Sequence, residues 1–347
     1  MASLTTTSQS LKKITPFLIF GLIILILAGA IIYRLTNKPK APLPVAINPP
    51  EITQNPSQQQ PRSFDFSNIQ IPDSPKKLPV YAVKPYNMTE ATTTTLAFSL
   101  GFSGNPSSVK GNTLDGEQYS WNMNNLTLTV SQTNLEYHNN EYRNRTLSTV
   151  DGLPLDQLRE KVDSFIQKVG LLGESLTLRK TEYQVISGLY RLPVENFEDV
   201  QIIEFSFGKQ LSNVPLVNNY PDSGFARVRI TKDGEVTYLT SRFFDKFSES
   251  GSYDLKTAKE AISEIQKGQG KVVQTQVLDE KGIPSNIYEH PENIENAKIE
   301  KVSLAYFLPN DIKDSVQPIF VFEGSFKTNK NEGGKVVIYL PAIKQAK

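Results

Sequence analysis

An uncharged apolar run near the N-terminus constrains this chain more than any other feature. The run from Phe17 to Tyr33 reads FLIFGLIILILAGAIIY and contains no charged side chain. As an α-helix it would span about 26 Å, and residues 14–35 would span about 33 Å, enough to cross a hydrocarbon core about 30 Å thick. Because only internal hydrogen bonds satisfy a backbone in lipid, the run predicts a transmembrane helix over 14–35, with Phe17 and Tyr33 as the ends of the membrane anchor.

Two alternatives to an uncleaved anchor stay open at this point. A cleaved signal peptide would use Lys12 and Lys13 as its basic region and residues 28–30, which read AGA, as its cleavage site. The apolar run continues beyond that site, which favours the anchor. A buried helix of a soluble protein is the other alternative, although no polar residue marks a solvent-facing side of the run.

The charges beside the run bear on its orientation. Two lysines precede it and three basic residues follow it, so the count is nearly even. A short tail, one anchor and a large C-terminal body are nevertheless typical of a protein whose N-terminus stays inside. We therefore expect residues 1–13 to be a cytoplasmic tail, the C-terminal body to be extracytoplasmic, and the helix to hold the chain in the cell membrane through the lipid bilayer.

Proline becomes frequent directly after the apolar run. Ten of the 22 prolines lie between Pro39 and Pro79. Proline lacks the backbone donor that helices and sheets need, and this stretch has few large apolar side chains. The composition predicts a disordered, Pro-rich linker over 36–79 that keeps the body away from the membrane. Residues 36–76 should then add nothing to the thermal stability of the body.

Most of the chain from residue 80 onward shows the alternation of β-strands. Alternating apolar residues flank three turn-forming pairs, and each pair predicts a hairpin. The pairs are Asn124-Asn125, Asp233-Gly234 and Gly333-Gly334. The runs 302–308, 319–322 and 336–340 are apolar at nearly every position, so we expect them in the middle of a sheet, covered on both faces.

Helical patterns are fewer and short. Apolar residues at helical spacing predict helices over 155–169, 257–267 and 89–100. The order of elements predicts an α+β fold with an N-terminal single transmembrane helix, a Pro-rich linker, and mainly antiparallel β modules that each carry a short packing helix. We expect an extracytoplasmic α+β domain over 80–250 and a second α+β module over 251–347.

Four segments of the body carry a family resemblance. They read YDLKTAKEAISEIQKGQGKVV from Tyr253, then KVSLAYF and QPIFVFEGSF, and FARVRITKDGEVTYLTSRF precedes them. These segments resemble bacterial membrane-anchored extracytoplasmic proteins of the PepSY and YycI/YycH-like type, in which a short helix packs on antiparallel strands. The resemblance implies a role in regulation, inhibition or assembly at the cell envelope, and it implies no reaction. The acidic residue before a Thr-Gly turn that usually ends a PepSY module is absent.

The composition excludes several classes of chemistry. The chain has no cysteine and two histidines, which excludes disulfides, thiol catalysis, iron–sulfur clusters and cysteine-based zinc sites. Its 37 basic and 36 acidic residues give a net charge of +1, so an electrostatic nucleic-acid binder is disfavoured. We expect no cofactor, no metal site and no nucleic-acid partner.

No catalytic motif stands out either. G-x-S-x-G, H-E-x-x-H and phosphate-loop patterns are all absent. His138 and His290 lie in polar segments and are interpreted as solvated surface residues. Carboxylate-only hydrolysis of the glycosidase type would need two carboxyl groups about 5 to 9 Å apart. The carboxylates that could serve are Asp199, Glu204 and Glu323.

These observations favour a non-enzymatic, single-pass, extracytoplasmic binding or regulatory module of the cell envelope. Its partner would be another envelope protein, a peptide or cell-wall material, held at exposed sheet edges by strand addition. A structural subunit of a secretion, pilus or division complex is the first alternative. A carboxylate-based hydrolase is the second, and no residue is assigned as catalytic.

Overall fold

The computed structural model describes most of the chain after the N-terminal region. The described residues are 47–345 without 54–59, 86, 111–115, 145, 150, 171–175, 189, 223, 243–245, 279–293, 309–314 and 329–331. Residues 46–347 form one compact unit. The expected cytoplasmic tail and the transmembrane helix over 14–35, with its ends Phe17 and Tyr33, lie outside the described residues. Among the described residues, no helix is both long enough and apolar enough to span a membrane.

The described part of the chain is mostly β-structure, and the expected α+β fold is wrong. Strands account for 52% of it and helices for 16%. The α-helices among the described residues are α2 (Glu90–Ser99), α3 (Leu155–Val169) and α4 (Ala258–Gln266). Fifteen of the described strands join one sheet, so backbone pairing between strands organises the fold, and the short helices cover parts of its surface.

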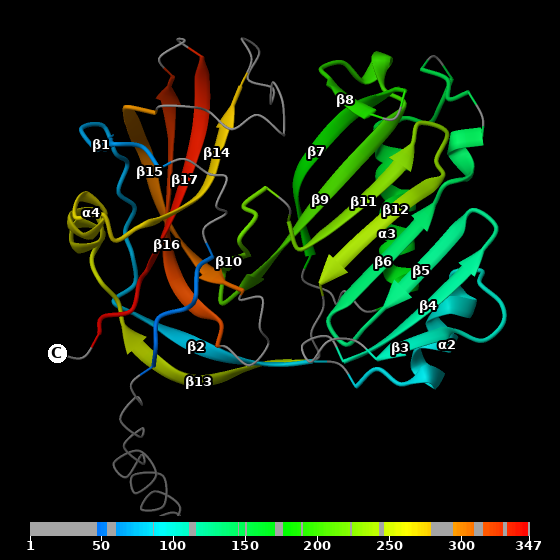
Figure 1. Ribbon diagram of the computed structural model, residues 1–347, viewed down its shortest axis with the longest axis horizontal. Helices are drawn as coiled ribbons and strands as arrows, with labels where there is room; N and C mark the ends of the chain where they lie inside the picture. The colour runs from blue at the N-terminus through cyan, green and yellow to red at the C-terminus, as the bar shows by residue number, and fades with distance from the viewer. Residues whose placement is uncertain are drawn as a thin grey trace, which may run out of the picture. The chain divides into compact units, whose positions relative to one another are not determined.

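A run of antiparallel strands forms the first half of this sheet (Figure 1). Its order is β8-β7-β9-β11-β12-β6-β5-β4-β3, and β8 pairs with β7 alone among the described strands. The bounds are β3 (Ser107–Lys110), β4 (Glu117–Met123), β5 (Leu126–Val130), β6 (Asn134–Asn139), β7 (Leu176–Ser187), β8 (Tyr190–Val194), β9 (Ile202–Leu211), β11 (Ala226–Thr231) and β12 (Val236–Arg242). Among the described residues, two 3-10 helices lie between these strands along the chain: η1 (Glu141–Asn144) follows β6, and η2 (Phe197–Asp199) follows β8.

Helices α2 and α3 lie on one face of these strands (Figure 1). Leu158 and Val162 of α3 join Phe205, Val228 and Leu239 of the sheet in a buried apolar core. Because side chains alternate along a strand, the residues between these core positions point to the opposite side. We call that side the open face, since no described α-helix covers it, although Tyr142 of the 3-10 helix at 141–144 packs with Ile202 at one end of it.

The second half of the sheet is buried on both faces. Its strands run in the order β14-β17-β16-β15-β10. Their bounds are β10 (Val214–Val217), β14 (Lys271–Val277), β15 (Asn296–Phe307), β16 (Gln317–Lys327) and β17 (Gly333–Pro341). One face packs against α4 and against a two-stranded antiparallel sheet of β2 (Lys77–Lys84) and β13 (Lys246–Asp254). The other face carries a separate apolar cluster. The expectation that the last apolar strands are covered on both sides is confirmed.

The described residues before β2 differ from the disordered linker expected over 36–79. Strand β1 (Ser63–Asp65) pairs in parallel with β15, and Gln70 forms an isolated bridge with Lys301. Ile52 is buried, and the Gln317 side chain donates a 2.8 Å hydrogen bond to the Asn48 carbonyl. A few apolar side chains spaced along a proline-rich segment are enough to pack it against a sheet, which composition alone did not reveal.

The hairpin turns and helices that the sequence predicts are largely present. The hairpins at Asn124-Asn125 and Asp233-Gly234 are confirmed, as are the three helices. The third hairpin exists between β16 and β17, but its turn precedes Gly333. Gly334 lies within β17 instead, where a Cβ atom would clash with the Phe326 ring.

Candidate functional site

A row of polar side chains crosses the open face from strand to strand. In the ladder register, Glu204 of β9 lies opposite Arg229 of β11, Arg229 lies opposite Tyr238 of β12, and Tyr238 lies opposite His138 of β6. Directly opposed side chains in antiparallel sheets are in contact distance. The row therefore forms one connected chain of interactions.

The row is held together by charge and by stacking. Glu204 is only 4% exposed, accepts a hydrogen bond from Arg229 Nε, and lies 3.9 Å from Arg227 Nη1. The Arg229 guanidinium lies 4.2 Å from the centre of the Tyr238 ring, whose other neighbour is the His138 ring at 4.9 Å. A buried carboxylate with two arginines is satisfied, so Glu204 is an anchor for these cations rather than a free acid.

A pocket of about 390 Å³ opens beside this row. It lies between η1 with its following loop and the β7–β8 hairpin. Its lining residues are Tyr142, Arg143, Thr146, Leu147, Ile186, Gly188, Tyr190, Arg191 and Gln201. The Gln201 side chain accepts from the Ile186 backbone at 2.8 Å and donates to the Leu147 carbonyl at 3.0 Å, so it fixes the loop against the end of β7. The volume is in the range of small-molecule and side-chain sites.

The pocket is rich in positive charge. Among the described residues, neither Arg143 nor Arg191 forms an ion pair, and Glu204 already binds Arg229. Desolvation lowers the pKa of Arg191, and the nearby Arg229 charge lowers it further. Crowded like charges favour binding of an anion, because the anion relieves their repulsion and supplies hydrogen-bond acceptors for the guanidinium groups.

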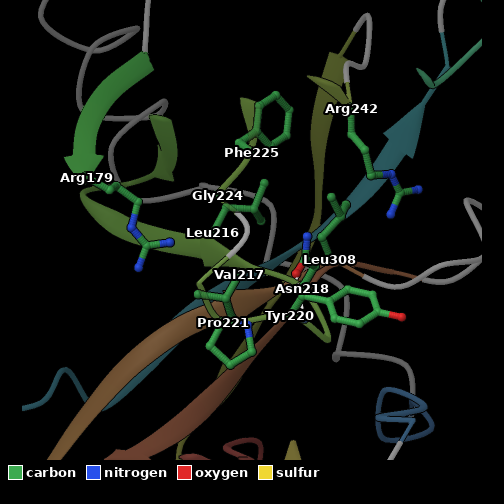
Figure 2. A pocket seen from close by; sticks show the side chains of 10 residues that line it. All are labelled: Arg179, Leu216, Val217, Asn218, Tyr220, Pro221, Gly224, Phe225, Arg242 and Leu308. Carbon is green, nitrogen blue, oxygen red and sulfur yellow. Dashed lines mark hydrogen bonds between the residues drawn. The ribbon is translucent and has the colours of Figure 1, made fainter. Parts of the chain in front are cut away.

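A second hollow lies between β7, the loop after β10 and the end of β12. Figure 2 shows Arg179 and Arg242 on opposite sides of it and the Tyr220 ring at its edge. Its cavity volume is about 10 Å³. That is room for about one water molecule, so this hollow does not fit an organic ligand.

Asp222 ties the loop beside this hollow to the second half of the sheet. Its carboxylate accepts hydrogen bonds from Gln274 and, at 3.1 Å, from Lys335. Burial by itself raises the pKa of Asp222, but these hydrogen bonds and the Lys335 charge outweigh burial and hold that pKa below its usual value. The ionised form is therefore the one that stabilises the folded state.

We expect Asp222→Asn to lower the free energy of unfolding at neutral pH by at most about 1 kcal/mol, because solvent screens the half-exposed pair. A lowered folded-state pKa gives stabilisation that is complete above the unfolded pKa and is lost as pH falls through the folded one. Urea unfolding between about pH 3 and pH 7 should thus give free energies of unfolding for the wild type and for Asp222→Asn that differ at neutral pH and converge at the acidic end. A difference that stays constant with pH would contradict the carboxylate role.

The structure does not gather the three candidate carboxylates around one site. Asp199 is exposed in η2, Glu204 is held by arginines, and Glu323 of β16 pairs with Lys301 at 3.4 Å. None of the three lines either hollow. His138 pairs with Glu136 at 2.8 Å, and His290 lies outside the described residues. Within the described ranges, no group of three acidic or histidine residues could hold a metal ion.

Sequence reasoning missed the arginine pocket. Arg143 and Arg191 are far apart in the sequence and belong to no motif. Pro193, inside the strand-like segment YRLPV, was the one local signal of an edge strand, because proline is tolerated there and not in the middle of a sheet.

Comparisons with known proteins show a structural likeness and no family. No protein-family model matches the chain, and no curated protein is significantly similar to it. Among solved structures, the chain is similar to an uncharacterized protein from Eubacterium rectale ATCC 33656, with 10% sequence identity and a TM-score of 0.47 over 82% of this chain and 88% of that one. A likeness at this level carries no functional argument. The resemblance to PepSY and YycI/YycH-like proteins stays a prediction.

Proposed function

We propose that this protein is a non-enzymatic, membrane-anchored binding module whose body lies outside the cytoplasm and docks an anionic partner on its open face. The observation that carries the proposal is the pocket of about 390 Å³ with two arginines that have no described carboxylate partner. The uncharged run 17–33 supports the anchor and the localisation. Antiparallel sheets commonly leave one face in water, and an open face that also holds a cationic pocket suits an anionic partner.

The direct test is photo-crosslinking in intact cells. A photo-reactive amino acid replaces Thr240, which lies on the open face of β12, in the full-length chain. We expect crosslinked species of defined mass, because a bound partner would lie within reach of this side chain. The matched control carries the same group at Gln167, an exposed residue of α3 on the helix-covered side. Equal crosslinking from both positions, or none from either, would contradict docking on the open face.

The location of the body is tested separately. Protease added to cells from which the outer layers have been removed should degrade residues 47–345 and leave a short membrane-bound N-terminal fragment. A body that stays protected until the membrane is dissolved would contradict the extracytoplasmic placement. Native mass measurement distinguishes the structural-subunit alternative, since a stable ring or stack would favour it over a binding module.

A further inference from the structure

The open edge of β8 lies beside the arginine pocket, and the two surfaces share two residues. Tyr190 and Arg191 belong to β8 and line the pocket. Among the described strands, β8 has β7 on one side and none on the other. We propose that an extended peptide segment of a partner protein pairs with this free edge, with acidic side chains directed into the pocket and apolar side chains on the opposite side of the added strand. This inference rests on the proposed function and specifies the chemistry of the partner.

The two sides of β8 differ in the manner that such a peptide requires. Leu192 shares one side with Val194, which packs on the helix-side core, yet Leu192 is 47% exposed. Tyr190, at the turn end of β8, is 68% exposed and also lines the pocket. Arg191 points to the other side, toward the pocket. Because side chains of an added strand alternate in the same way, an apolar residue would cover Leu192 while a neighbouring acid meets Arg191.

The backbone of the edge can bind a short segment. The β7–β8 hairpin closes at the Ser187–Tyr190 pair, so Tyr190 and Leu192 exchange hydrogen bonds with β7 in the alternation of an antiparallel ladder. The backbone groups of Arg191 and Pro193 therefore face the free edge, and Pro193 offers a carbonyl and no donor. About three backbone hydrogen bonds are weak by themselves, so affinity must depend on the arginines.

The charge balance selects an acidic partner. Arg143 and Arg191 lie close enough to influence each other electrostatically, and Glu204, the carboxylate that acts on Arg191, already pairs with Arg229 and Arg227. A carboxylate in the pocket would form charge-assisted hydrogen bonds with one or both guanidinium groups. A basic or neutral segment would leave this positive charge uncompensated.

The test uses labelled peptides and the full-length protein in detergent. The probe is a fluorescein-labelled peptide of alternating valine and glutamate residues, and its partner probe has glutamine in place of glutamate. Fluorescence anisotropy should show that the glutamate peptide binds at least about tenfold more tightly, as expected for a charge-assisted hydrogen bond. Arg191→Gln and Arg143→Gln should each lower the affinity for the glutamate peptide about tenfold. Arg179→Gln, which changes an exposed arginine at the other hollow, should leave it unchanged.

Two further measurements separate strand pairing from simple anion binding. N-methylation of the peptide backbone should weaken binding at least about tenfold, because it removes the donors that an added strand uses. Inorganic phosphate at matched ionic strength should compete weakly. Any of four results would overturn the inference. They are equal affinity for the glutamate and glutamine peptides, an Arg191→Gln variant that behaves like Arg179→Gln, unchanged binding after N-methylation, and full competition by phosphate. Open-face crosslinks in cells without peptide binding would refute this inference alone, and peptide binding without crosslinks would refute the proposed function.

Discussion

A chain that begins at Lys76 is expected to melt about 6 to 12 °C below a chain that begins at Ala46, which corresponds to about 3 kcal/mol for a unit of this size. The shorter chain loses strand β1 and the burial of Ile52, together with the partly buried Phe64 and Phe66. Each of these side chains contributes about 1 kcal/mol or more when it leaves water, and the conformational entropy that the free segment recovers offsets part of the sum.

Thermal unfolding followed by circular dichroism measures this difference. Phe66→Ala in the longer chain provides an intermediate case, because the Phe66 ring packs edge-on against Phe322 with centroids 6.3 Å apart. We expect this variant to lose a part of the stability that the truncation removes. Equal melting temperatures for the two chain lengths would mean that residues 47–75 act as the free linker that their composition suggests.

Lys232→Met is expected to lower the free energy of unfolding by about 3 to 4 kcal/mol, since three carbonyls each lose a hydrogen bond to a charged group and each loss costs about 1 kcal/mol or more. Lys232 is only 6% exposed, and its ammonium donates to the carbonyls of Thr149, Phe197 and Glu198. It joins three segments that are distant in the sequence: the β11–β12 turn, the loop before α3, and η2. Methionine has a similar length and no donor, so the three carbonyls would lose their partner without a large cavity.

Urea unfolding of the Lys232→Met variant measures this loss, and Lys259→Met is the matched control. Lys259 is exposed on α4, so its replacement should change the free energy by less than about 0.5 kcal/mol. A Lys232→Met variant as stable as the control would show that the three carbonyls find water or other donors instead.

Local features of this fold were predictable because their causes are local. The Thr257–Glu260 capping box starts α4, and the Asp233-Gly234 turn closes the β11–β12 hairpin through a glycine at φ +95°. Such choices depend on residues within a few positions of each other, so they can be recognised in the sequence. The joining of fifteen described strands into one sheet depends on pairings between distant segments, and this was not foreseen.

The candidate site illustrates the same limit. Glu204 was noticed as an acid, but its role follows from Arg229 and Arg227, which β11 brings to the opposite position in the ladder. The pocket combines η1, the end of β7 and strand β8, and its arginines carry no signature of their own. Only the register of the strands decides which charges meet.

The sequence by itself determined the positions of turns and helix ends, the alternation that gives each strand an apolar side, and the uncharged N-terminal run, because these depend on near neighbours and on side-chain chemistry. Tertiary structure decided which strands became neighbours, that part of the proline-rich segment packs as β1, and that Arg143 and Arg191 share a pocket without a carboxylate. The physical reason is that long-range pairing is selected by the combined burial of many side chains, and a single sequence does not display that sum.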